Sequence, residues 1–74
     1  MKNKTPDHLK ISLIFFIEKI YPHFEDSKIY RMELKAMRAR YIYKDISKAE
    51  FLKDVAYLKN LKDILIIRKK FVYS

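Results

Sequence analysis

Soon after the first proline of the chain, apolar residues begin to recur three or four positions apart. This spacing places them on one face of an α-helix. The residues concerned are Leu9, Leu13, Phe16, Ile17 and Ile20. We expect Thr5 to be the N-cap and Pro6 the first helical residue, where its missing N–H has no helical partner to lose. Pro22 should stop this first helix near Tyr21.

A second apolar stripe follows the next helix-start signal, Asp26-Ser27. Its members are Tyr30, Leu34, Met37 and Tyr41. We expect this helix to end near Arg40 and residues 41–45 to connect it to the next element. Two tyrosines of that connection, Tyr41 and Tyr43, are predicted to close the core; stacking on unpaired bases is the alternative.

The third helix start is a capping box, in which Ser47 and Glu50 stand three positions apart. Ile46 and Phe51 occupy the two positions of a hydrophobic staple, so the helix should begin at Lys48. We expect its inward stripe to be Phe51, Leu52, Val55 and Leu58. Asn60 is the expected C-terminal cap.

The C-terminal segment allows two interpretations. Residues 64–67 are a short apolar run rich in β-branched side chains, followed by Arg68, Lys69 and Lys70 and then by residues 71–73, which favours a strand or a hairpin with a basic tip. Alternatively, helix three continues to the end, because Leu58, Leu61 and Leu65 also keep helical spacing.

These elements predict one mainly helical domain over residues 1–74. We expect a three-helix, helix-turn-helix core with a short C-terminal β strand or hairpin; the alternative is an all-α three-helix bundle. The chain has no glycine, which disfavours tight hairpins and all-β folds because residues in such turns often need a positive φ angle.

The amino-acid composition excludes several classes of protein. Half of the 74 residues are apolar, which is typical of a folded chain rather than a disordered one. The absence of cysteine excludes disulfides and thiolate metal sites and favours a cytoplasmic protein. No apolar run approaches the length that a membrane span needs, so we expect no membrane partner.

Charge is distributed unevenly along the chain. Residues 1–26 carry equal numbers of basic and acidic side chains, so the net charge of +8 resides in residues 27–74. Such an excess is typical of proteins that bind polyanions, because basic side chains on phosphates release condensed counterions. A solvated basic surface without a partner is the alternative interpretation.

The positions of these charges suggest a DNA-binding surface. Lys28, Arg31, Lys35 and Arg38 form one basic stripe on the second helix, suited to a phosphate backbone. The third helix should present Lys48, Lys53, Tyr57 and Asn60 to a phosphate, sugar or base edge. Ordinary solvated helix faces would show the same residue types. Arg68, Lys69 and Lys70 complete the predicted set.

The third predicted helix opens with residues 46–54, continues through residues 55–59, which include Leu58, and is followed by the aliphatic residues 64–67. With this pattern, the three predicted helices resemble a small winged helix-turn-helix domain. The resemblance covers about residues 9–73. It implies duplex DNA binding with helix three in the major groove and Arg68, Lys69 and Lys70 at or near the wing. It therefore suggests a small transcriptional regulator, of the kind that phages, plasmids and other mobile elements encode.

Nothing in the sequence indicates catalysis. His8 and His23 lack the spacing of a metal-binding pair, and the chain has no Gly-rich phosphate loop and no nucleophile beside a base. We therefore expect a binding protein without a metal or other cofactor.

Two further partners are predicted. Ile11 and Phe15 form an apolar pair on the opposite side of the first helix, which suggests a homodimer interface unless the C-terminal segment covers them. A second functional hypothesis is a small helical inhibitor or antagonist that binds an acidic protein partner through the same basic surface.

Overall fold

The computed structural model describes the backbone of residues 4–73 and the side chains of residues 4–69. Four helical elements follow one another: α1 (Asp7–Ile20), the short 3-10 helix η1 (Tyr21–Phe24), α2 (Lys28–Tyr43) and α3 (Lys48–Tyr73). The prediction of a mainly helical chain is therefore confirmed.

The first helix begins and ends close to the predicted positions. Pro6, with extended backbone angles, is the N-cap, so the prediction that Thr5 fills this role is wrong by one residue. Thr5 is instead buried; its N–H donates to the Ile46 carbonyl at 2.8 Å and its hydroxyl to the Ser47 carbonyl at 3.2 Å. These bonds tie the start of α1 to the start of α3.

Pro22 lies within η1, directly after α1. This short turn carries Phe24 into the core, where its ring is fully buried and packs edge-on against Tyr30 with the ring centroids 5.1 Å apart. The predicted cap of the next helix is confirmed, since the Ser27 hydroxyl accepts a hydrogen bond from the Tyr30 N–H. The helix α2 therefore starts where the sequence predicts.

The connection between α2 and α3 is shorter than predicted. The helix α2 continues to Tyr43, because the Lys44 N–H still bonds to the Arg40 carbonyl at 2.9 Å. Tyr41 is buried, as predicted, but Tyr43 is 83% exposed and does not close the core. Because the two residues are two positions apart in the helix, their side chains point to different faces.

Half of the predicted capping box forms at the start of α3. The Ser47 hydroxyl accepts a hydrogen bond from the Glu50 N–H at 3.2 Å. Ile46 belongs to the core cluster, and the partly buried Phe51 packs against it. The Glu50 carboxylate, however, bonds to Arg40 on α2 at 3.0 Å. The charged partner on a neighbouring helix has thus replaced the local backbone partner.

The predicted C-terminal strand or hairpin is wrong. The helix α3 runs without a break from Lys48 to Tyr73, and no strand occurs in residues 4–73, so the prediction that Asn60 caps the helix also fails. A strand needs a partner to satisfy its backbone groups, and the described chain offers none. The all-α alternative is the one that the structure supports.

The core is built mainly from one face of each helix. Its buried apolar members are Leu13, Ile17, Ile20, Phe24, Leu34, Met37, Tyr41, Ile46, Leu58 and Leu61. Two residues of the predicted inward stripe are not part of this core: Leu52 is 58% exposed, and Val55 is also exposed. The face of α3 that packs on the bundle is rotated toward Asp54, Leu58 and Leu61.

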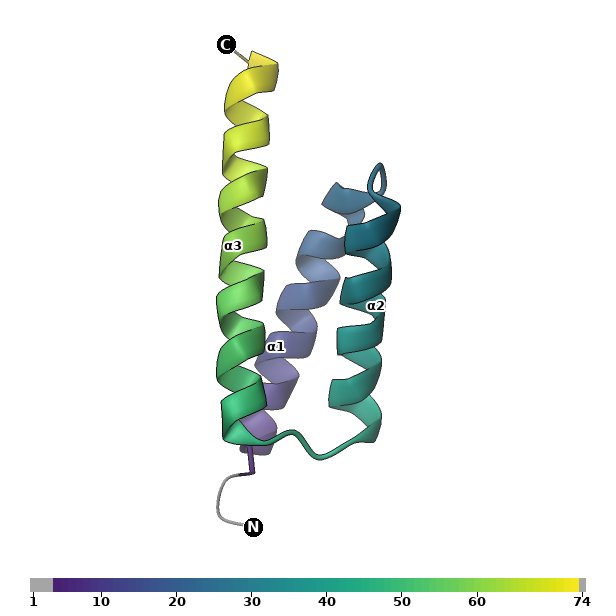
Figure 1. Cartoon of the computed structure of the whole chain (residues 1–74), viewed down its shortest axis with the longest axis vertical. Coiled ribbons are helices and arrows are strands. Elements are labelled where there is room, and N and C mark those ends of the chain that lie inside the picture. The colour runs from purple at the N-terminus through teal and green to yellow at the C-terminus, as the bar shows by residue number, and fades with distance from the viewer. Residues whose placement is uncertain (1–3, 74) are drawn as a thin grey trace.

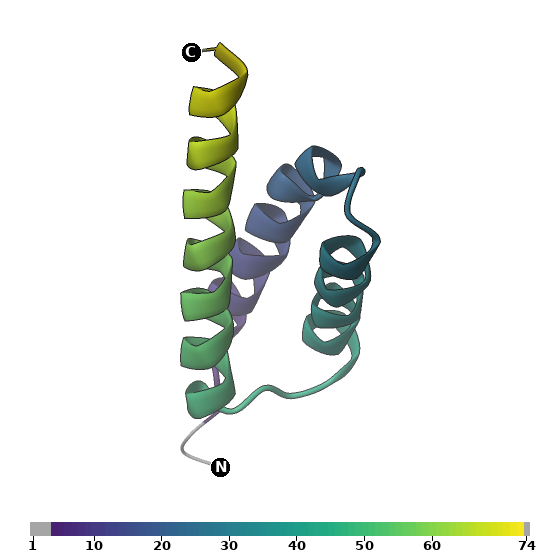
Figure 2. The same cartoon turned by 45° about the horizontal axis from the view of Figure 1, so that its top comes forward.

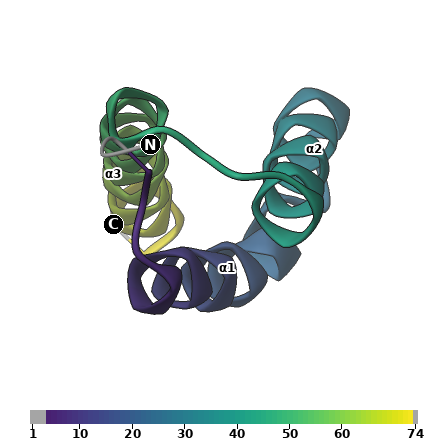
Figure 3. The same ribbon diagram turned by 90° about the horizontal axis from the view of Figure 1, so that it is seen from below.

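The three long helices form an up-down-up bundle that is open on one side. Successive helices run in opposite directions, and α1 starts beside α3 and ends beside α2 (Figures 1 and 2). Seen from below, α1 is the base of a U whose arms are α2 and α3 (Figure 3). In a helix-turn-helix the second and third helices meet steeply, whereas α2 and α3 here run antiparallel.

Candidate binding surfaces

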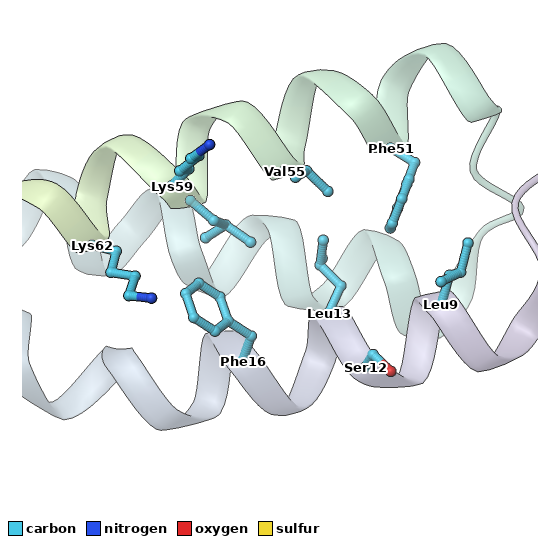
Figure 4. Close-up of a pocket in the computed structure, with 9 residues that line it drawn as sticks. Leu9, Ser12, Leu13, Phe16, Phe51, Val55, Lys59 and Lys62 are labelled. Carbon is cyan, nitrogen blue, oxygen red and sulfur yellow. The ribbon is translucent and has the colours of Figure 1, made fainter.

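An apolar groove lies between α1 and α3. It encloses about 340 Å³ and is lined by Leu9, Ser12, Leu13, Phe16, Phe51, Val55, Leu58, Lys59 and Lys62. The phenyl ring of Phe16 and the side chains of Leu9 and Leu13 point toward α3, and Phe51 points back toward α1 (Figure 4). The two helices therefore present apolar side chains to each other without filling the space between them.

The groove follows from the path of α1. The helix α1 leaves α3 and approaches α2 along its length (Figure 2). The apolar residues of α3 beside the groove are only partly covered. Val55 remains exposed and Phe16 is half-buried. Incompletely covered apolar positions of this kind mark binding sites more often than isolated exposed apolar residues do.

The polar residues of the groove are basic or neutral. Its nine lining residues include two lysines, Lys59 and Lys62, and no carboxylate. The Lys62 side chain extends from α3 toward α1, whereas the Lys59 amine points away from it (Figure 4). A ligand in the groove would therefore meet an apolar floor and positive charge along the α3 edge.

The opposite side of α3 is joined to α2 by polar side chains. Arg40 bonds to the Glu50 carboxylate at 3.0 Å and to both oxygens of Asp54, at 3.1 and 3.3 Å. The Tyr41 hydroxyl donates to Asp54 at 2.8 Å and the Tyr57 hydroxyl to Glu33 at 2.5 Å. These bonds hold the two arms of the U together.

Both tyrosine hydroxyls of this network are held in the neutral form. Burial raises the pKa of Tyr41 well above its usual range, and the hydrogen bond to Asp54 raises it further. Burial likewise raises the pKa of Tyr57, assisted by the hydrogen bond to Glu33. Each hydroxyl is therefore a hydrogen-bond donor to a carboxylate, and neither is set up as a base.

The predicted basic stripe of α2 forms only in part. Lys28 and Lys35 are exposed, Arg31 is half-buried, and Arg38 is paired with Glu18 of α1, with 2.8 Å from its Nε to the carboxylate. The stripe lies on the side of α2 that borders α1, because Lys35 and Arg38 line a second, smaller groove there. One of its four predicted phosphate contacts, Arg38, is therefore already paired with a carboxylate.

The predicted DNA-binding residues of α3 are dispersed. Lys48, Lys53, Asn60 and Lys69 are exposed. Tyr57 faces α2 through its bond to Glu33, and Arg68 forms an ion pair with Asp26 and lies over the Phe24 ring. The Lys70 side chain lies outside the described residues.

These residues do not form one surface. The α2 stripe borders α1, whereas Tyr57 of α3 turns toward the other side of α2. The structure therefore does not bring the α2 stripe and Tyr57, a predicted reading residue of α3, onto a common face. The remaining positive charge is spread over at least two sides of the bundle.

The predicted dimer residues remain uncovered. Ile11 and Phe15 are both exposed on α1, and Phe15 is 65% accessible. The α3 helix continues past the bundle instead of folding back over them (Figure 1). Whether a second copy covers them stays a prediction.

Sequence reasoning missed the groove, including Lys59 and Lys62. Val55, Lys59 and Lys62 keep helical spacing beside the core stripe, but this spacing does not distinguish a groove from a solvated helix face. It also missed the outer face of α2, where Ile29, Met32 and Tyr43 are exposed. Neither surface can be recognised before the helices are placed, because the same residues would be core in another packing.

Comparison with protein-family models, with curated proteins and with solved structures finds no match to this chain. No helix in the described residues has both the length and the apolar character that crossing a membrane requires. Within the same residues, no group of three or more His, Cys, Asp or Glu side chains is arranged to hold a metal ion.

Proposed function

We propose that this chain is a helical binding module that takes an apolar segment of a protein partner into the groove between α1 and α3. The observation that carries the proposal is the groove itself, with six apolar residues, two lysines and no carboxylate among its nine lining residues. This is the protein-partner hypothesis raised from the sequence, now assigned to a different surface.

The chemistry of the groove indicates the kind of segment that fits. An amphipathic helix binds a hydrophobic groove through side chains spaced at i, i+3 or i+4 and i+7. The positive charge of Lys59 and Lys62 along one edge favours a segment with carboxylates beside its apolar face. We therefore expect an acidic amphipathic helix to bind and a basic one of the same apolar pattern to be rejected.

A designed peptide pair tests this proposal. Both peptides carry leucines at i, i+3 and i+7, one with flanking glutamates and the other with flanking lysines, and each is titrated into isotope-labelled protein while amide chemical shifts are recorded. The acidic peptide should shift the amides around Phe16, Val55 and Lys62 and bind at least about tenfold more tightly. Shifts spread over the whole protein, or equal binding of both peptides, would contradict the proposal.

Variants on α3 supply the matched control. Val55→Glu places a carboxylate on the groove wall and should abolish binding of the acidic peptide, whereas Ala56→Glu adds the same charge at an exposed neighbour that does not line the groove. Both positions are exposed, so both variants should fold. Equal loss of binding in the two variants would assign the effect to net charge and not to the groove.

We propose duplex DNA binding as a second function. The net charge of +8 and the exposed Lys28 and Lys35 support it. Without a wing, such binding would rest on backbone contacts from α2, and a sequence-specific regulator would need reading residues that this arrangement does not gather. The expectation is therefore nonspecific, strongly salt-dependent binding.

A salt titration on random duplex tests the second proposal. Log affinity should fall linearly with log salt concentration, and the double variant Lys28→Ala, Lys35→Ala should reduce the slope by about 2. The control is Lys59→Ala, Lys62→Ala, which removes the same charge from the groove edge. No binding at low salt, or equal slopes for both double variants, would remove the assignment to α2.

A further inference from the structure

The outer face of α2 carries an apolar stripe that no described part of the chain covers. Its members are Ile29, Met32, Ala36, Ala39 and Tyr43, spaced alternately by three and four residues. All five are exposed: Ile29 is 70% accessible and Met32 61%. This is the a and d pattern of a helix that packs lengthwise against another helix.

We propose that this stripe pairs with α2 of a second copy of the chain, the two helices running antiparallel. The position of α2 permits it, because α2 forms one arm of the U and its outer face points away from both other helices (Figure 3). Neither lysine of the α1–α3 groove nor any other groove residue belongs to α2. The proposed contact and the groove are therefore separate surfaces.

The order of side-chain sizes along the stripe supports an antiparallel register. Layers of an antiparallel pair join an a position of one helix to a d position of the other. One register places Ala36 opposite Ala39 of the second copy and Met32 opposite Tyr43 of the second copy. Two alanine layers at the centre let the backbones approach closely, and a thioether meets an aromatic ring at each end.

The flanking charges select the same arrangement. In this register, Glu33 of each copy lies beside Arg40 of the other, which gives two opposite-charge pairs. On the other flank, the aliphatic part of Lys35 lies beside Ile42 of the second copy. A parallel pair would instead place Lys35 beside Arg40, and this repulsion would offset the attraction between Lys28 and Glu33.

Of the two flanking groups, Glu33 is exposed and Arg40 is partly exposed. Tyr57 bonds to one carboxylate oxygen of Glu33, at 2.5 Å, and Arg40 contacts α3 through its two terminal nitrogens. The second copy would therefore extend a polar network that already lines this side of α2. Both groups are held in place by α3, which reduces the side-chain entropy lost on pairing.

A single helix pair buries a small interface, so the dimer should be weak, with a dissociation constant on the order of 10 µM. Sedimentation velocity of the full chain over a concentration series tests this, and the sedimentation coefficient should rise toward the dimer value near about 100 µM. A constant monomeric value over that range would overturn the proposal.

Variants identify the surface. Ala36→Glu places two carboxylates at the centre of the proposed contact and should raise the dissociation constant at least 100-fold. The matched control is the double variant Ile11→Glu, Phe15→Glu on the exposed face of α1, which should leave the dimer unchanged. If the control variant alone dissociates the dimer, the interface is on α1 and the proposal fails. Far-ultraviolet circular dichroism checks that each variant folds.

Single cysteines determine the orientation, since the natural chain contains none. The variants Ala36→Cys and Ala39→Cys are mixed in equal amounts and oxidised mildly. An antiparallel pair should give mainly the mixed disulfide, because these positions face each other across the contact. A parallel pair would give mainly disulfides between identical variants, and that product distribution would overturn the proposed orientation.

Discussion

The two parts of α3 have similar apolar content and different surroundings. In its first part, residues 48–65, the helix packs on the bundle, and Leu61 has no accessible surface. In its last two turns it extends past the ends of α1 and α2 (Figure 1), and Ile67 is 52% exposed. Branched aliphatic residues occur in both parts. Burial along this helix is therefore decided by the length of its neighbours and not by its own apolar content.

The largest expected effect on stability comes from truncating one apolar residue in each part of α3. Leu61→Ala removes a fully buried side chain and should lower the free energy of unfolding by about 3 kcal/mol. Ile67→Ala changes an exposed side chain and should lower it by less than about 0.5 kcal/mol. Urea denaturation followed by circular dichroism measures both, and equal effects would mean that the last turns are packed in solution.

The difference between these parts also explains what the sequence could and could not predict. The helix starts at Ser27 and Ser47 were predicted because a hydroxyl cap is a local signal, read within four residues. The C-terminal strand was predicted from the β-branched Ile64, Ile66 and Ile67. That preference is weak, and without a partner strand the helix, which satisfies its own backbone groups, prevails.

The binding surfaces were less predictable than the helices. Which basic residues remain available depends on acids from other elements, as when Glu18 pairs with Arg38 or Asp26 with Arg68. Such pairs join residues 20 and 42 positions apart, so no local pattern indicates them. The basic residues of the α2 stripe can be read from the sequence, but which of them are left unpaired depends on the packed bundle.

A second prediction concerns the network that anchors the packed part of α3. Arg40→Ala should lower the free energy of unfolding by about 1.5 kcal/mol, because it leaves the mostly buried Asp54 carboxylate without its cation. The matched control is Arg38→Ala, which breaks an ion pair between two well-exposed side chains and should change it by less than about 0.5 kcal/mol. Thermal and urea denaturation measure both; equal effects would place Asp54 in solvent.

The same network predicts a response to alkaline pH. Burial and carboxylate hydrogen bonds raise the pKa of Tyr41 and Tyr57 above the ordinary value of 10.0, so the folded chain keeps protons that the unfolded chain releases. The contribution of these two hydroxyls to stability should be constant below about pH 10 and fall as pH rises beyond it. Tyr57→Phe should weaken this fall, whereas Tyr43→Phe, at an exposed position, should not. An equal response of both variants would show that the Tyr57 hydroxyl is not protected.

The smallest expected effect lies at the boundary between the two parts of α3. Arg68 is the last described side chain that joins α3 to the rest of the bundle, through its ion pair with Asp26 and its position over the Phe24 ring. Arg68→Ala should change the free energy of unfolding by less than about 0.5 kcal/mol, because the ion pair is exposed. Amide hydrogen exchange should nevertheless quicken several-fold in Ile66 and Ile67, while Leu58 and Leu61 keep their protection.

Lys69→Ala, one residue along and exposed, is the control and should leave the exchange rates unchanged. If Arg68→Ala quickened exchange equally at Leu61, the boundary would have to be moved toward the core, and the two parts of α3 would unfold as one unit.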